Sequence, residues 1–167
     1  AYVLMSLALA LCTPLFLVFG ALSDRIGRKK IMLAGCLLGA LTYVPIYMGM
    51  KQFSNPDGLP AADPAQIQYV PMVLLLCVQM VYVCMVYGPI AAFLVELFPT
   101  RIRYTALSVP YHIGVGWFGG LLPAVVFAIN TATGSIYQGL WFPVIATAVS
   151  ALVMLFFLPE TKNRDIH

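Results

Sequence analysis

The chain has 167 residues, of which 62% are hydrophobic and only 9% are charged, and its formal net charge is +3 at pH 7. A soluble domain carries about 25% charged residues, so this composition excludes a water-soluble domain and predicts a protein surrounded mostly by lipid. The basic residues lie in short connections and form no basic face, which excludes nucleic acid as a partner.

Five apolar segments follow one another along the chain, and each is long enough to cross a bilayer, which takes roughly 20 residues. They cover residues 2–22, 31–50, 71–97, 105–129 and 139–158. Every backbone amide in lipid must find its hydrogen bond within its own segment, so we expect these spans to be helices. The sequence therefore predicts an all-α membrane protein with five transmembrane helices.

The basic residues alternate between the connections, with eight of the nine on one side of the membrane. These eight are Arg25, Arg28, Lys29, Lys30, Arg101, Arg103, Lys162 and Arg164, and Lys51 is the exception. The positive-inside rule makes their side cytoplasmic, so residues 51–70 and 130–138 are expected to be outer loops and 159–167 a cytoplasmic tail. We expect an integral protein of a bacterial inner membrane. A membrane protein with both ends inside needs an even number of spans, so at least one span is expected before residue 1.

A charged turn separates the first two spans, with Gly20 and Gly27 at its two ends. Glycine permits close helix approach and unusual backbone angles. Asp24 is costly at the end of a membrane span unless it meets a cation, and Arg25 and Arg28 are the nearest ones. An ordinary positive-inside loop is the alternative, but any mixture of Lys and Arg would serve there.

The string formed by Gly20, Asp24, Arg25, Gly27, Arg28 and Lys29 resembles the signature loop of the major facilitator superfamily. The resemblance implies a cytoplasmic latch whose charges tie two halves of a carrier together when it faces outward. Three more spans and a tail follow, which matches helices eight to twelve of a twelve-helix carrier. The chain is thus similar to a C-terminal half, and the N-terminal half is the partner that it implies.

Two further strings support this resemblance. Residues 95–103, with Glu96, Arg101 and Arg103, look like the acidic-basic loop after helix ten, and residues 159–162, with Glu160, look like a motif after helix twelve. Tyr111-His112-Ile113-Gly114 is closest to the metabolite:proton symporter branch, which carries organic acids, proline and betaine. Glu96 and Arg101 or Arg103 can meet Arg28 and Glu160 on one cytoplasmic surface, where several ion pairs would bias a two-state carrier. The alternative is that each residue only anchors a helix end in the headgroups.

Polar residues inside the spans are the candidates for contact with a solute, because they are costly in lipid. Gln79 and Tyr82 lie three residues apart and so share a helix face, with interhelical hydrogen bonding as the alternative. Tyr111 and His112 lie in the fourth span. Histidine is the side chain that ordinarily changes its charge near neutral pH, so His112 is either a proton-coupling or substrate-binding group, or a histidine bonded to a neighbour.

Two glycine pairs, Gly35 with Gly39 and Gly116 with Gly120, have the four-residue spacing of close helix packing. The leading hypothesis is a secondary active transporter, not an enzyme, that couples uptake of a small polar organic solute to protons by alternating access. The resemblance leaves open a sugar porter, or a non-transporting sensor or channel on the same fold. The residues predict no cofactor, metal site or catalytic group, and the expected partners are the solute, the proton and the bilayer.

Overall fold

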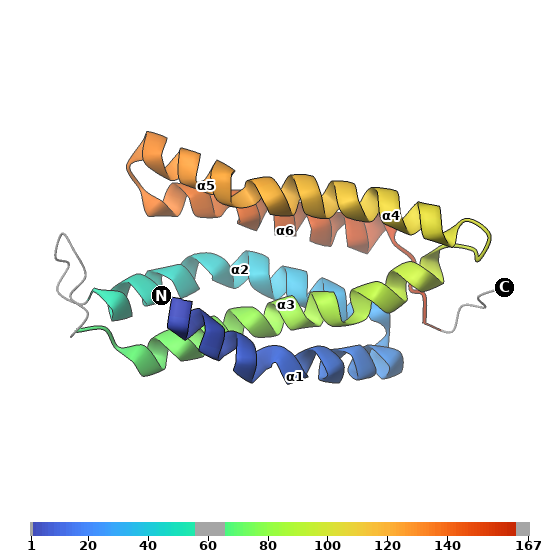
Figure 1. The fold of residues 1–167 in the computed structure, drawn as a ribbon, viewed down its shortest axis with the longest axis horizontal. Coiled ribbons are helices and arrows are strands. Elements are labelled where there is room, and N and C mark those ends of the chain that lie inside the picture. Colours follow the sequence, from blue (N-terminus) through green and yellow to red (C-terminus); the bar gives the residue numbers. More distant parts are fainter. Residues whose placement is uncertain (1, 56–65, 163–167) are drawn as a thin grey trace.

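The computed structural model describes residues 2–55 and 66–162, which form helices in two layers (Figure 1). The first layer holds α1 (Tyr2–Ile26), α2 (Arg28–Ser54) and α3 (Tyr69–Leu97). The second holds α6 (Ile136–Phe157) and one long span made of α4 (Arg103–Ile113), a π-helical turn η1 (Gly114–Gly119) and α5 (Gly120–Thr133). Five helical spans are long and apolar enough to cross a membrane, which confirms the predicted all-α fold class.

The junction between α1 and α2 is tighter than the sequence suggests. Asp24 and Arg25 still belong to α1 and Arg28 begins α2, so Gly27 alone interrupts the helices. Its φ of 121° lies where side chains are rarely accommodated, and this conformation lets the chain reverse in one residue. Gly20 does not border the turn but lies within α1.

The charged connections lie together at one end of the bundle. The α1–α2 junction, the α3–α4 connection and the segment after α6 are all on the right in Figure 1, while the α5–α6 turn is on the left. Residues 56–65 of the expected outer loop and residues 163–167 of the expected tail, with Arg164, lie outside the described residues.

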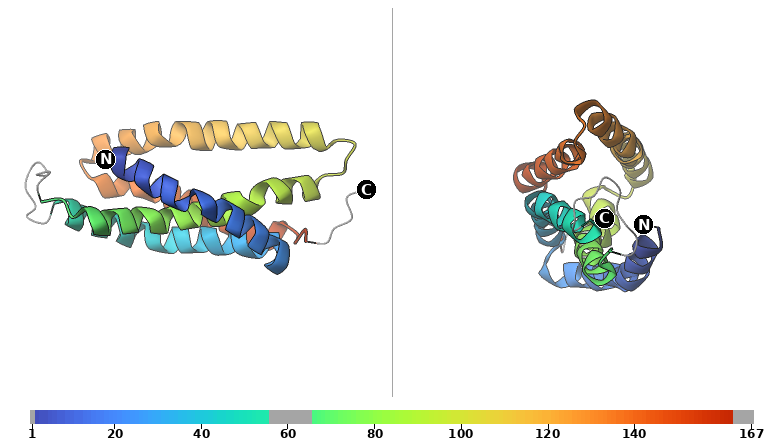
Figure 2. Two further views of the ribbon diagram at one scale, coloured as in Figure 1. Left: turned by 60° about the horizontal axis from the view of Figure 1, so that its bottom comes forward. Right: turned by 90° about the vertical axis from the view of Figure 1, so that its left-hand side faces the viewer.

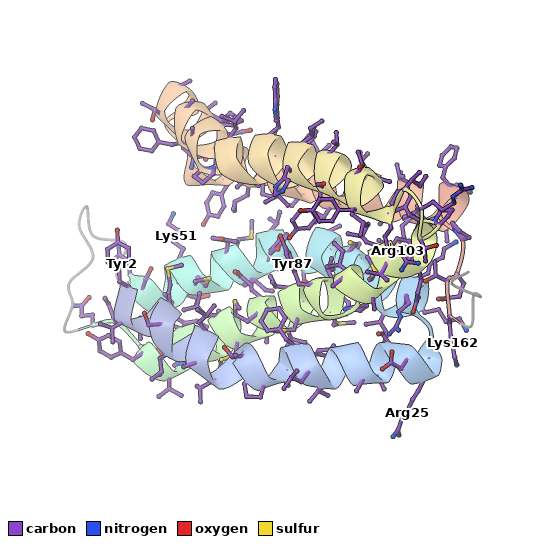
Figure 3. All side chains as sticks on the ribbon, turned by 45° about the vertical axis from the view of Figure 1, so that its right-hand side comes forward. Tyr2, Arg25, Lys51, Tyr87, Arg103 and Lys162 are labelled. Carbon is purple, nitrogen blue, oxygen red and sulfur yellow. The ribbon has the colours of Figure 1, made fainter. Side chains whose placement is uncertain are left out.

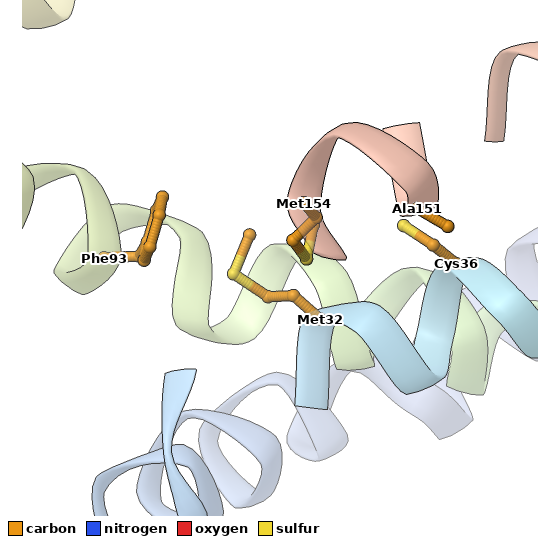
Figure 4. Packing of buried hydrophobic residues seen from close by; sticks show 5 residues of the cluster. All are labelled: Met32, Cys36, Phe93, Ala151 and Met154. Carbon is orange, nitrogen blue, oxygen red and sulfur yellow. The ribbon is translucent and has the colours of Figure 1, made fainter. Parts of the chain in front are cut away.

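Helix α3 is the centre of the first layer, since both α1 and α2 pack along it. The two layers meet mainly through α2 and α6, which lie side by side in the end-on view of Figure 2. A buried cluster holds this junction together, with Met32 and Cys36 from α2, Phe93 from α3, and Ala151 and Met154 from α6 (Figure 4). The long span from Arg103 to Thr133 packs against α6 and touches α3 at only a few positions.

The two predicted glycine pairs have different surroundings. A Cβ atom on Gly35 would lie 2.9 Å from the Cβ of Met85, so this glycine does allow α2 to approach α3 closely. Gly39 faces only the ring of Tyr43 on its own helix. Gly116 and Gly120 have nothing within 4 Å among the described residues, so the close packing predicted for this pair is wrong within this chain.

Candidate functional site

The charged residues of three helices converge on the side chain of Arg28 at the start of α2. Its guanidinium donates to Glu96 near the end of α3, with Nη2 to Oε1 at 2.9 Å and Nε to both carboxylate oxygens at 3.3 Å. Its Nη1 group donates to the Ser23 hydroxyl at 2.7 Å and pairs with the Asp24 carboxylate. The side chains of Arg28 and Glu96 are only 12% and 14% exposed, so this ion pair is sheltered from solvent and weakly screened.

The carboxylate of Glu160 caps the N-terminus of α2 from the far end of the chain. Its Oε1 accepts from the backbone N–H of Arg28 at 2.8 Å and of Lys29 at 3.4 Å. The first amides of a helix have no partner within the helix, and their end of the helix dipole favours a negative charge. A Cβ on Gly27 would lie 2.6 Å from Glu160 Oε2, so the glycine also makes room for this carboxylate.

Two residues of this cluster, Ser23 and Thr161, have fully buried side chains and were not predicted from the sequence. The hydroxyl of Thr161 donates to Glu96 Oε2 at 2.7 Å, and that of Ser23 donates to the carbonyl of Gly20 at 2.6 Å. Thr161 follows Glu160 and Ser23 precedes Asp24 in the sequence. A small hydroxyl residue next to a charged one can complete a hydrogen-bond network, so this adjacency could have indicated their role.

Two lysines complete the connections between helix ends. Lys29 Nζ donates to the carbonyl of Leu155 in the last turn of α6 at 2.9 Å, and Lys162 Nζ donates to the carbonyl of Arg25 in the last turn of α1. Carbonyls in the last turn of a helix lack intrahelical partners and carry the negative end of the dipole, so a lysine stabilises both. The segment after α6 is therefore fastened across the α1–α2 junction.

Other predicted residues stay outside this cluster. The side chain of Arg25 points away from the bundle in Figure 3, and that of Arg101 has no hydrogen bond or ion pair with the described residues. Arg103 donates through Nε to the carbonyl of Phe98 at 3.2 Å, while its Nη2 is buried without a partner in the described part of the chain. Asp24 is 59% exposed although it pairs with Arg28.

The cluster joins four helix ends of this chain into one unit. Arg28 begins α2, Glu96 lies near the end of α3, and Glu160 and Thr161 lie in the segment after α6. Ser23 and Asp24 connect the end of α1 to them through Arg28. The structure thus gives these charges a role in holding the helix ends of this chain together. Asp24, Arg25, Arg101 and Arg103 keep exposed surface or donor capacity for other contacts.

The predicted solute-contact residues do not form one site. Gln79 lines a cavity between α1, α2 and α3, and its Nε2 lies 3.6 Å from Met50 Sδ. The hydroxyl of Tyr82 pairs with Thr42 on α2 at 3.2 Å, a geometry that favours interhelical hydrogen bonding. Tyr111 and His112 line a different cavity between α3 and α4, where their rings make an edge-to-face contact with centroids 5.9 Å apart.

Comparison with known families matches residues 1–167 to the family described as "Sugar (and other) transporter". The chain therefore belongs to this family of the major facilitator superfamily, whose members are transporters and not enzymes. Its helices are those of an integral membrane protein.

Relatives of similar sequence are bacterial. A Staphylococcus aureus (strain COL) protein provisionally named a proline/betaine transporter is 28% identical over 164 residues, which are 98% of this chain and 32% of the relative. A Haemophilus influenzae protein provisionally named a metabolite transport protein is 29% identical over 150 residues, 89% of this chain and 30% of the relative. The chain thus spans about a third of the length of these relatives. No solved structure matches it significantly.

Proposed function

We propose that this chain is the C-terminal half of a proton-coupled symporter that takes up a small polar organic solute, such as an organic acid or a proline- or betaine-like compound, by alternating access. The membership in a transporter family and the names of the bacterial relatives support this proposal. The full carrier lies in the bacterial inner membrane, with the tail after α6 in the cytoplasm, in agreement with the positive-inside rule.

The observation that carries the proposal is the cluster around Arg28. Alternating access is largely a rigid-body rocking of one half against the other around a central site. A half that rocks as a unit needs its helix ends fixed to one another. Arg28, Glu96 and Glu160 provide this by joining α1, α2, α3 and the segment after α6 at the inner end.

The residues that remain available at this end are the candidates for the latch with the N-terminal half. Asp24 is mostly exposed, Arg25 and Arg101 are exposed, and Arg103 retains a buried donor without a partner among the described residues. We expect them to pair with charges of the other half in the outward-facing state and to release in the inward-facing state. Substitution of Asp24, or of Arg28 with which it pairs, should reduce turnover of the full-length carrier more than substrate binding, because the latch lies away from the solute path.

The test of transport is uptake into vesicles that contain the purified full-length protein. Radiolabelled betaine, proline, an organic acid and glucose are offered separately, with and without an imposed inward proton gradient. Accumulation of one of the first three that requires the gradient supports the proposal. Accumulation of glucose identifies a sugar porter instead, and specific binding without accumulation identifies a sensor.

Proton coupling through His112 has its own measurement. His112→Gln replaces the imidazole, which can take up and release a proton, with an uncharged amide of similar size and polarity. If His112 couples protons, the pH dependence of uptake becomes flatter between about pH 5 and 8. Ser108→Ala, which changes another residue of the same cavity, is the control. An unchanged pH profile assigns His112 to packing and leaves the coupling group in the other half.

A further inference from the structure

Three of the four cysteines meet where α1 packs along α3 (Figure 1). Cys12 lies on α1, while Cys77 and Cys84 lie seven residues apart on α3 and so share one side of that helix. Cys12 and Cys84 are 4% and 0% exposed, which shows that neighbours within this chain already cover them. The spacing of cysteines in the sequence does not indicate this group, because helix packing brings together residues that are far apart along the chain.

Close packing of α1 against α3 fixes the register of this group. The Cys84 thiol donates to the carbonyl oxygen of Cys12 at 3.6 Å. One helical turn further along both helices, a Cβ on Gly88 would lie 3.0 Å from the carbonyl oxygen of Phe16, so the two backbones approach each other closely. Both contacts belong to one register, and the sulfur atoms are therefore held between two helices that pack within this chain.

The thiols of Cys12 and Cys77 are neighbours across this contact. Sγ of Cys12 lies 3.9 Å from the carbonyl oxygen of Cys77, and the two side chains also interact with each other. Thiols form only weak hydrogen bonds, so these interactions leave both sulfur atoms able to bind a stronger partner. The thiol of Cys84 is instead directed to the backbone of Cys12. Cys12 and Cys77 thus provide two sulfur ligands from different helices.

Two thiols in an apolar interface select a soft metal ion that needs only two ligands. Thiolate sulfur prefers soft ions, whereas Zn²⁺ ordinarily takes four ligands. The described residues contain no group of three or more His, Cys, Asp or Glu side chains that could hold a metal ion. The mercuric ion binds two thiolates in a linear arrangement, and its two positive charges cancel theirs. A neutral complex avoids the cost of a buried charge, whereas Ag⁺ would leave the same pair with a net negative charge.

We propose that Cys12 and Cys77 form a binding site for Hg²⁺ that joins α1 to α3 within the membrane. Mercuric chloride is uncharged and can reach the site through the bilayer. Each thiol gives its proton to water and forms one bond from sulfur to mercury, while one chloride leaves the metal for each bond formed. Two protons and two chlorides are released in total, and no atom is oxidised or reduced. The site requires neither a transported solute nor a contribution from the N-terminal half.

Retention of mercury tests this pair in a full-length carrier that keeps only the four cysteines of this chain. The purified protein receives one equivalent of mercuric chloride, and glutathione is then added until the metal is released. A second ligand held beside the first strengthens binding by about 10²–10⁴-fold. Cys12→Ala and Cys77→Ala should therefore release mercury at a glutathione concentration at least about 100-fold lower. Cys36→Ala is the matched control and should retain the metal, since Cys36 is similarly buried but belongs to the cluster with Met154. Retention by Cys77→Ala equal to that of the four-cysteine protein would overturn the proposal.

Protection of the thiols checks the same pair without a substitution in the site. The four-cysteine protein is loaded with one equivalent of mercuric chloride and denatured directly into excess maleimide, and the labelled cysteines are identified by peptide mass spectrometry. Cys36 and Cys84 should be labelled, while Cys12 and Cys77 should be protected. All four should be labelled when mercury is left out. Labelling of Cys12 or Cys77 to the same extent as Cys36 in the loaded protein would refute the site, whether or not the carrier transports a solute.

Discussion

The inner end of the first layer and the long span from Arg103 to Thr133 differ in almost every contact. At the inner end, Arg28, Glu96, Glu160 and Thr161 form a network that connects four helix ends; Arg28 and Glu96 are largely buried, Thr161 is fully buried and Glu160 is exposed. The long span has no fully buried residue in α4, η1 or α5 among those described, and a Cβ added to Gly114, Gly116 or Gly120 would meet nothing.

This difference separates a part of the chain whose helix ends are bonded to one another from a span that has few contacts within this chain. The π-helical turn η1 divides the long span, and π-turns often mark functional sites within helices. On its outer side, α5 is held to α6 by the Asn130 side chain, which accepts from the Gly139 N–H at 2.8 Å. On its inner side, α4 carries Tyr111 and His112 and has few contacts with α3. We expect α4 to shift more easily than any helix of the first layer.

The largest effect is expected from Glu96→Ala, which leaves Arg28 sheltered without its main partner. Removing one member of a buried ion pair costs about 3–5 kcal/mol, and the partial exposure here places the loss in the free energy of unfolding near the lower end. Denaturation of the full-length protein in micelles measures it. Arg25→Ala removes an exposed charge and should change stability by less than about 0.5 kcal/mol. Equal losses in the two variants would show that the cluster does not stabilise this end.

Gly27→Ala should be the next most damaging change. It forces a side chain into a φ of 121° and onto the Glu160 carboxylate, for a loss of about 2–3 kcal/mol in the free energy of unfolding. Gly134→Ala is the matched control, because Gly134 also has a positive φ, of 67°, but lies in open space. Its cost should be only about 1 kcal/mol. A smaller loss at Gly27 than at Gly134 would argue against the close approach of Glu160.

Thr161→Val tests whether the buried hydroxyl supports the ion pair. The variant keeps the shape of the side chain but removes a hydrogen bond to a carboxylate, which is worth about 1.5–3 kcal/mol. Thr131→Val removes an exposed hydroxyl that bonds within its own helix, and should be nearly neutral. A double variant with Glu96→Ala should lose less than the sum of the two, because both remove the same contact.

The smallest change in stability among these variants is expected at Gly116. Unlike the others, this variant should be more stable than the wild type. Gly116→Ala finds open space among the described residues and should stabilise the helix by about 0.5–1 kcal/mol, while turnover falls if η1 has to flex. Gly35→Ala is the contrasting variant, because it would push α2 from Met85 on α3 and destabilise the protein by about 1–3 kcal/mol. Unchanged turnover in Gly116→Ala would argue against movement at η1.

The sequence predicted the members of the charged cluster better than their arrangement. Arg28, Glu96 and Glu160 were identified because they lie in strings that resemble motifs of the major facilitator superfamily, and their positions at the ends of apolar spans on one membrane side allow them to meet. The same reasoning grouped Arg25, Arg101 and Arg103 with them, yet these three make other contacts or none with the described residues. Thr161 was missed because its position beside Glu160 does not show that its side chain is buried against Glu96 of α3, which depends on helix packing.

Hydropathy and the placement of cations determined the five spans and their alternating direction, because lipid imposes length and charge rules on every segment separately. Helix packing decided the rest. Tyr82 lies where α3 meets α2 and its hydroxyl is bonded to Thr42, whereas Tyr87 is 49% exposed, although the two tyrosines look alike in the sequence. Which neighbour covers each face of a helix depends on contacts between distant segments, and an apolar stretch does not encode these in its own order of residues.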